Sequence, residues 1–201
     1  GNSIRPAVPV IDAVTEVPSG RWDVEALYAP EPVAGQSVSR WGGFCADVES
    51  FDPEAFGLTD AEVTDLDPAV RMVMETVRAC LADAGYDPTE LAGRHVGVVI
   101  GARMSTYRER IPTAHAAHTL GGDQNYIAAQ VAQLYDLRGA TVVVDSACSS
   151  ALVALQAADG LLRSGQCEMV LVGGVEVLLD ERPYVEFTAA RALSPSGRCA
   201  T

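Results

Sequence analysis

Residues 141–150 have the sequence TVVVDSACSS, in which an apolar run leads through a short polar turn to a single cysteine, Cys148. The β-branched residues 141–144 predict a buried strand, and residues 149–165 predict a helix with a glycine at its far end. Unpaired backbone N–H groups and the helix dipole favour an anion where a helix begins, so we expect the thiolate of Cys148 to form readily. This turn is therefore suited to hold a nucleophile.

Many free cysteines are simply small buried apolar residues, and this is the alternative for Cys148. The small residues Ser146 and Ala147 before it, and Ser149 and Ser150 after it, favour instead a tight corner with the sulfur exposed at the edge of a sheet. In that corner, Asp145 is expected either to hold the turn through backbone hydrogen bonds or simply to end the strand.

Strands and helices alternate along the rest of the chain. Short apolar runs predict strands at residues 96–100, 169–172 and 175–179, and apolar periodicity predicts helices at 67–84 and 124–134. Such alternation favours a largely parallel sheet covered by helices, and the two adjacent final strands favour an antiparallel edge. The sequence therefore predicts an α/β fold.

Three further features refine this prediction. In the helix at 67–84, Asp67 is expected to cap the N-terminus, Pro68 to take the first helical position and Cys80 to lie on the apolar face. Residues 1–60 show little periodicity and many Pro and Gly residues, which predicts long loops with short regular pieces. The pair at 173–174 lacks the spacing of a phosphate-binding loop, so it predicts close packing of backbone.

The composition of the chain restricts the kinds of partner that it can bind. The formal net charge is −13, with only 14 Lys and Arg residues, which argues against nucleic acid or an anionic membrane surface as a partner. The densest basic run, Arg103, Arg108 and Arg110, is expected to be a solvated loop or, alternatively, a docking site for an acidic carrier protein. Five isolated cysteines, with no apolar run long enough to cross a bilayer, predict a cytoplasmic protein.

Several segments in order resemble one family. Residues 145–155, DSACSSALVAL, are similar to the active-site segment of β-ketoacyl synthases, the thiolase-fold condensing enzymes of polyketide and fatty-acid assembly. The other matching segments are residues 21–23 (RWD), 41–44 (WGGF), 51–52, 56–58, 67–75, 137–139, 173–175 and 192–199 (ALSPSGRC). The resemblance therefore extends from about residue 14 to the last residue, and the motifs are most similar to those of type I polyketide synthases.

The resemblance implies a fold and an activity. The fold would be the N-terminal half of a thiolase-like αβαβα layered domain, with residues 1–66 as a loop-rich segment and residues 67–201 as the first α/β half. Cys148 would take an acyl group from the phosphopantetheine arm of an acyl carrier protein and condense it with a malonyl group on another carrier. No cofactor would be bound by this chain itself, and the full domain would be a homodimer.

The family's two catalytic histidines lie in a C-terminal half that this sequence does not contain. His95, His115 and His118 do not fall in matching motifs, and the spacing of the last two lacks a third ligand, so we expect no metal site. Two alternatives remain open: a non-elongating transacylating or structural partner of a carrier protein, and a cysteine hydrolase. The second is disfavoured because Ser146 and Ser150 occupy the positions where a hydrolase elbow requires glycine.

Overall fold

The computed structural model describes residues 11–103, 105–110 and 123–199. The chain divides into two compact units. The sheet unit comprises Asp47–Leu179, and the terminal unit comprises Gly1–Ala46 together with Asp180–Thr201. Within the described ranges, no helix is both long enough and apolar enough to cross a membrane.

The sheet unit is built on three parallel strands in the order β4-β3-β5. The central strand β3 (Val96–Ala102) is buried along its whole length, as expected for a strand covered on both faces. β4 (Thr141–Val144) and β5 (Met169–Val175) pair with its two sides. Because β4 is an edge strand, Thr141 and Val142 are exposed, and the prediction that this strand is buried is wrong for the chain by itself.

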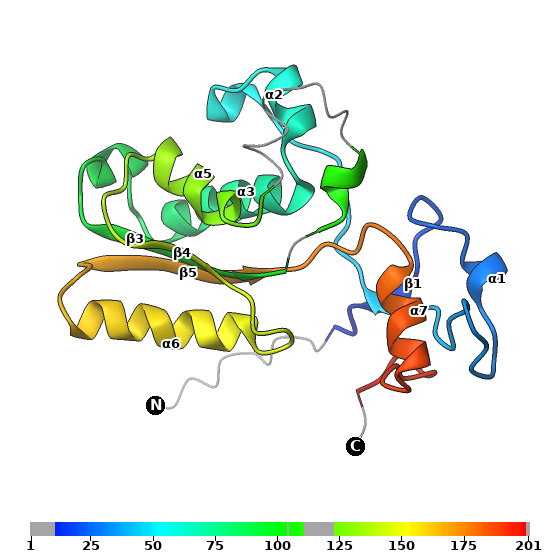
Figure 1. Cartoon of the computed structure of the whole chain (residues 1–201). Coiled ribbons are helices and arrows are strands. Elements are labelled where there is room, and N and C mark those ends of the chain that lie inside the picture. Colours follow the sequence, from blue (N-terminus) through cyan, green and yellow to red (C-terminus); the bar gives the residue numbers. More distant parts are fainter. Residues whose placement is uncertain (1–10, 104, 111–122, 200–201) are drawn as a thin grey trace, which may run out of the picture. The chain divides into compact units, whose positions relative to one another are not determined.

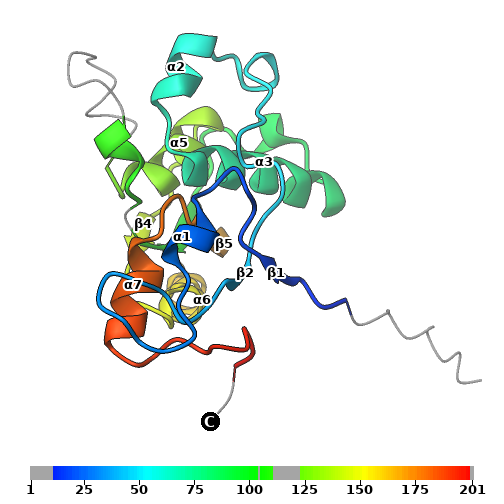
Figure 2. The same ribbon diagram turned by 90° about the vertical axis from the view of Figure 1, so that its right-hand side faces the viewer.

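Helices cover both faces of this sheet. In Figures 1 and 2, α3 (Pro68–Asp83) and α5 (Tyr126–Leu134) lie over one face and α6 (Ser150–Arg163) lies over the other. The remaining elements of the unit are α2 (Asp60–Asp65) and the 3-10 turns η1 (Glu54–Phe56), η2 (Pro88–Leu91) and η3 (Tyr107–Arg110). The result is a layered α/β arrangement, which confirms the predicted fold class.

The helix α3 begins as the sequence predicts. Oδ1 of Asp67 accepts a hydrogen bond from the backbone N–H of Ala69 at 2.8 Å, and Pro68 occupies the first turn, where its missing N–H has no cost. Its buried face carries Val70, Met74 and Leu81, which join the main core of the unit. Cys80 is exposed rather than part of this face, because it lies on the side of the helix turned away from the sheet.

The C-terminal strand differs from the prediction. Residues 169–175 form one continuous parallel strand that passes through Gly173 and Gly174, and residues 176–179, all of them described, are not in a strand. The predicted separate strand at 175–179 is therefore wrong. Among the described residues, antiparallel pairing occurs instead between β1 (Val14–Glu16) and β2 (Trp41–Gly43) in the terminal unit.

The terminal unit is held by an aromatic cluster and a few buried polar contacts. Besides its two strands it contains the short helix α1 (Val24–Leu27) and α7 (Arg182–Ala189). The ring of Trp22 packs edge-on against Phe44 and Tyr184, and the Tyr184 hydroxyl donates to the carbonyl of Trp41 at 2.9 Å. Burial raises the pKa of Tyr184, which keeps this hydroxyl a donor. In the described part of residues 1–59, the regular elements β1, α1, β2 and η1 are three or four residues long, and loops connect them.

Candidate functional site

Cys148 lies on the turn between a strand and a helix. β4 ends at Val144, and α6 begins at Ser150 with Ser149 as the preceding cap residue. The side chain of Cys148 is exposed, so the predicted location is confirmed: the sulfur is at the C-terminal edge of a parallel sheet, beside the first turn of a helix. Nucleophiles are commonly held in this position because the helix N-terminus favours an anion.

The turn is held by its own polar side chains. Oδ1 of Asp145 accepts a hydrogen bond from the N–H of Ala147 at 3.0 Å, which confirms the first of the two roles considered for this residue. The Ser149 hydroxyl donates to the carbonyl of Ser146 at 2.8 Å. Ala147 has φ 55, in the left-handed region, a conformation that costs a residue other than glycine about 1 kcal/mol or more. The turn that carries Cys148 therefore has a strained backbone conformation that side-chain hydrogen bonds hold in place.

Ser150 is a residue whose role was not predicted from the sequence. Its side chain is buried; its hydroxyl accepts a hydrogen bond from the N–H of Ser146 at 2.9 Å and donates to the carbonyl of Ala147 at 2.6 Å. The available signal was a serine in the first turn of a helix, where short hydroxyl side chains tend to bond to nearby backbone. In contrast, the backbone N–H of Cys148 makes no hydrogen bond within the described part of the chain.

Two glycines bring the start of α6 directly onto the sheet. A Cβ added to Gly101 in β3 would lie 2.5 Å from the carbonyl carbon of Ser150 and 2.6 Å from the nitrogen of Ala151. A Cβ added to Gly174 in β5 would lie 2.8 Å from the Cβ of Ala151. These contacts confirm the prediction of close backbone packing for Gly174. They do not extend to Gly173, whose added Cβ would meet nothing within 4 Å.

Charged residues follow the ends of all three strands near this turn. Asp145 follows β4, Arg103 follows β3 and Glu176 follows β5, and the parallel register places these strand ends at one edge. Desolvation raises the pKa of Glu176; the positive charge of Arg103 opposes the shift and the negative charge of Asp145 adds to it. Glu176 therefore accepts a proton more readily than an ordinary glutamate.

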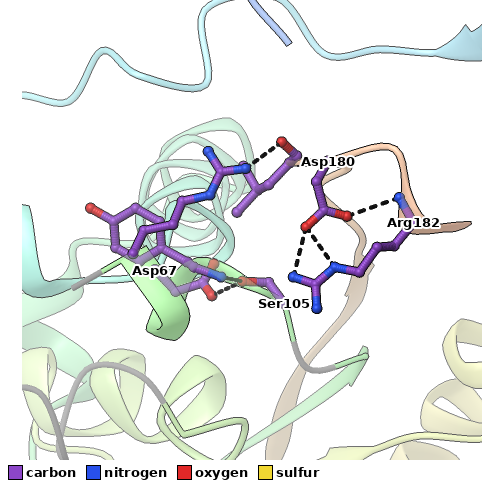
Figure 3. Close-up of polar contacts among 7 residues, drawn as sticks. Asp67, Ser105, Asp180 and Arg182 are labelled. Atoms are coloured by element: carbon purple, nitrogen blue, oxygen red, sulfur yellow. Dashed lines mark hydrogen bonds and ion pairs between the residues drawn. The ribbon is translucent and has the colours of Figure 1, made fainter. Parts of the chain in front are cut away.

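The segment that leaves β3 is fastened to the start of α3. Figure 3 shows Ser105 directed at Asp67, to whose Oδ2 the serine hydroxyl donates. The Arg71 guanidinium donates to the Tyr107 hydroxyl at 3.2 Å, and that hydroxyl donates to the carbonyl of Thr64 at 2.6 Å. Asp67 and Arg71 are both buried, so this network satisfies charges that would otherwise be costly to bury.

The predicted basic run makes contacts within the chain. Arg108 forms an ion pair with Asp123, and Arg110 donates to the carbonyl of Leu179 at 2.8 Å. Arg103 is exposed. Two of the three arginines therefore make contacts that stabilise the chain itself. Docking of a carrier protein through these arginines stays a prediction.

The other cysteines and His95 lie on segments of the chain other than this turn. Cys167 is buried, as expected for a core residue, and Cys45 and Cys199 are exposed. His95 precedes β3, and its carbonyl accepts from the N–H of Glu168. His115 and His118 lie outside the described residues. Within the described ranges, no group of three or more His, Cys, Asp or Glu side chains is placed to hold a metal ion.

A parallel sheet between helices, with an exposed cysteine on a strand-to-helix turn, is the arrangement of thiolase-like ketosynthases. The oxazolomycin ketosynthase domain of Streptomyces albus matches this structure with a TM-score of 0.83 and 34% identity, over 94% of this chain and 33% of that one. The ketosynthase from module 6 of the bacillaene synthase of Bacillus subtilis matches with a TM-score of 0.83 and 30% identity, over 93% and 31%.

The sequence comparisons agree with this class. Residues 10–201 match the family described as Beta-ketoacyl synthase, N-terminal domain, and the chain belongs to that family. It is 39% identical to a mycocerosic acid synthase-like polyketide synthase of Mycolicibacterium smegmatis over 94% of this chain, and 42% identical to the polyketide synthase ThaG of Burkholderia thailandensis over 92%. The chain spans only 9% and 3% of the lengths of these relatives.

Proposed function

We propose that the chain supplies the nucleophile of a β-ketoacyl synthase in polyketide biosynthesis, and that Cys148 is that nucleophile. Its thiolate attacks the carbonyl carbon of an acyl thioester on the phosphopantetheine arm of a carrier protein. A carbon–sulfur bond to Cys148 forms, the carbonyl becomes an oxyanion, and its collapse expels the phosphopantetheine sulfur, which takes a proton. The acyl group is then held on the enzyme.

Condensation follows with a malonyl group on a second carrier. Loss of carbon dioxide leaves a carbanion, which attacks the carbonyl of the acyl-enzyme. The bond to Cys148 breaks, the thiolate is regenerated, and the product is a β-ketoacyl group on the second carrier. The observation that carries this proposal is the exposed Cys148 thiol beside a backbone N–H that is free within the described part of the chain; such an N–H is a suitable donor to the oxyanion.

Elongation would require a C-terminal half that contributes two catalytic histidines. Support for this requirement comes from length, because the chain covers about a third of each solved ketosynthase it matches. It also comes from α6, which places Ala154 against the sheet and turns larger leucines outward. On this proposal, residues 67–201 form the first α/β half of the domain and residues 1–66 form a loop-rich segment.

The partners follow from the same proposal. They are acyl carrier proteins, the C-terminal half and a second copy of the full domain, and this chain binds no cofactor of its own. The exposed edge of β4 supports the dimer, because an unpaired strand edge offers backbone groups to another chain. Five free cysteines support a reducing, cytoplasmic location.

The proposal is tested by mass spectrometry of the chain after incubation with an acyl-pantetheine thioester, alone and with the C-terminal half of a related ketosynthase supplied. The sequence contains no lysine, so acylation by chance is limited to thiols and the N-terminal amine. We expect acyl mass on the peptide that carries Cys148, faster with the second half present and lost in Cys148→Ala. The matched control Cys80→Ala removes another exposed thiol and should not change the result.

Adding a malonyl carrier protein then distinguishes a condensing synthase from a transacylating partner. Release of a β-ketoacyl product supports the synthase, whereas acylation without elongation identifies a transacylating partner. Absence of acyl mass on Cys148 with both halves present contradicts the proposed role of this residue.

A further inference from the structure

We infer that Ser150 is a positioning residue that directs the backbone N–H of Cys148 toward the reacting carbonyl oxygen. This inference rests on the proposed function, because it concerns how the same site stabilises an oxyanion. The Ser150 hydroxyl bridges the turn: it accepts from the N–H of Ser146 at 2.9 Å and donates to the carbonyl of Ala147 at 2.6 Å. The hydroxyl thus connects the backbone N–H of Ser146 to the peptide group between Ala147 and Cys148.

Peptide geometry links this contact to the nucleophile. The carbonyl of Ala147 and the N–H of Cys148 belong to one planar peptide group and point in opposite directions. Holding the Ala147 oxygen therefore fixes the direction of the Cys148 N–H. That N–H makes no hydrogen bond in the described part of the chain, so it is available to an oxygen of the substrate.

The backbone holds this direction only in part: the Ala147 carbonyl also accepts a hydrogen bond from the Ser150 backbone N–H at 3.0 Å, but the conformation of Ala147 opposes it. Ala147 has φ 55, and a residue with a Cβ is less stable there than in the ordinary extended or helical regions. Two hydrogen bonds to a hydroxyl, each contributing about 1 kcal/mol net, are of the size needed to offset that strain. Without the hydroxyl, one backbone hydrogen bond remains on the Ala147 carbonyl, and the turn is freer to adopt conformations that direct the Cys148 N–H elsewhere.

Ser150 is itself held in place. Its side chain is only 8% exposed, and its backbone carbon lies against Gly101 of β3 at a distance that no side chain on residue 101 would permit. The hydroxyl therefore connects the turn to the packed interface of α6 and the sheet. Ser164 differs, because it lies at the C-terminal end of α6, is exposed, and its hydroxyl donates to the carbonyl of Leu161 at 3.2 Å. It provides a matched control on the same helix that does not touch the turn.

Two reagents distinguish orientation of the N–H from mere exposure of the thiol. When 4-nitrophenyl acetate acylates Cys148, the sulfur attacks the carbonyl carbon, an oxyanion forms, and nitrophenolate leaves. When iodoacetamide alkylates the same sulfur, a carbon–sulfur bond forms and iodide leaves, with no oxyanion at any stage. Only the first reaction benefits from an N–H donor placed near the oxygen.

The experiment measures both rates at Cys148 by peptide mass, with the C-terminal half supplied and with the Cys148→Ala background subtracted. For Ser150→Ala we expect the acylation rate to fall about tenfold or more while the alkylation rate changes by less than about twofold, as expected when no oxyanion donor is needed. Ser164→Ala should leave the ratio of the two rates unchanged. Ser150→Thr, which keeps the hydroxyl, should restore the ratio and covers the case in which Ser150→Ala does not fold.

Equal losses in both reactions, or no loss in either, would overturn the inference, as would a ratio in Ser150→Thr as low as that expected of the alanine variant. Both reagents react with any accessible thiol, so the result does not depend on whether the chain accepts carrier-bound acyl groups. Failure of the proposed function is detected separately, with acyl-pantetheine and malonyl carrier protein.

Discussion

Glu176 shows how a single charge near the candidate nucleophile affects folding. Its carboxyl is partly desolvated at the end of β5, and the nearby Asp145 adds a repulsive charge that Arg103 only partly offsets. These causes raise its pKa in the folded chain. A group with a raised pKa stabilises the fold at low pH and loses that contribution as the pH rises through the folded value.

We therefore predict that Glu176→Gln is more stable than the parent at neutral pH. This difference in stability should disappear when the pH falls below 4.5, the pKa of the glutamate in the unfolded chain. The reason is that glutamine keeps the shape of the side chain without the charge that desolvation disfavours. The measurement is urea unfolding at several pH values, followed by circular dichroism. Glu49→Gln, at an exposed loop position, is the control. A parent that gains stability over Glu176→Gln as the pH rises contradicts this account.

Residue-scale predictions from sequence were good where local chemistry decides the outcome. Asp67 caps α3 as expected, and Asp145 holds the turn that carries Cys148, which is one of its two expected roles. Both contacts are local, because they reach only two residues along the chain. The prediction for Cys80 was wrong, since its surroundings depend on how the whole helix is rotated against the sheet. No role was predicted for Ser150, although its hydroxyl bonds only three and four residues back along the chain. The sequence shows the apolar periodicity of α3, but it does not show which residues at the edges of the apolar face are buried.

At the scale of elements, the packing of α6 on the sheet depends on Gly101. We predict that Gly101→Ala destabilises the chain by about 3 kcal/mol, because the added methyl meets backbone atoms that cannot turn aside. Gly173→Ala is the matched control: it lies in the neighbouring strand β5 and its methyl would meet nothing within 4 Å. Circular dichroism in urea suits this comparison because both tryptophans, Trp22 and Trp41, lie outside the sheet unit. Equal stability of the two variants would count against close packing at Gly101.

The network between α3 and the segment after β3 gives a second prediction at this scale. In Tyr107→Phe, the buried Arg71 and the carbonyl of Thr64 each lose a hydrogen-bond partner. We expect a loss of about 1–3 kcal/mol and faster amide hydrogen exchange over residues 105–110. Tyr86→Phe removes a hydroxyl from an exposed ring and should change neither quantity. If residues 105–110 exchange at the parent rate in Tyr107→Phe, the network does not hold this segment.

Strand prediction shows where sequence information stops at this scale. The runs at 96–100 and 141–144 were identified correctly because strand length and β-branched residues agree. The pair Gly173 and Gly174 suggested a break between two strands, whereas β5 continues through both. Glycine at a close approach and glycine at a turn are alike in sequence, and only the position of Ala151 against Gly174 separates them.

At the scale of the whole molecule, the outer face of α6 is unusual for a chain that stands alone. Ala154 and Ala158 are buried against the sheet, while Leu152, Leu155 and Leu162 are 73%, 54% and 45% exposed. These leucines lie at spacings of three and seven residues, so they form one stripe along the helix. Exposed apolar stripes of this kind mark surfaces that another protein segment covers. The proposed occupant is the C-terminal half of the same domain.

Replacing this stripe should therefore weaken both the self-association of the isolated chain and its binding to the C-terminal half. In Leu152→Gln combined with Leu155→Gln, we predict less self-association of the isolated chain, measured by sedimentation, because glutamine removes apolar surface while suiting a helix. Binding of the C-terminal half should weaken by about a hundredfold or more, since the two leucines contribute about 1.5–3 kcal/mol each when buried and about 1.4 kcal/mol corresponds to a tenfold change in affinity. Gln156→Ala, at an exposed position on the same helix, should alter neither measurement. A double variant that binds the second half as tightly as the parent would show that α6 is covered by something else, and the site of contact between the halves would then have to be sought on another surface.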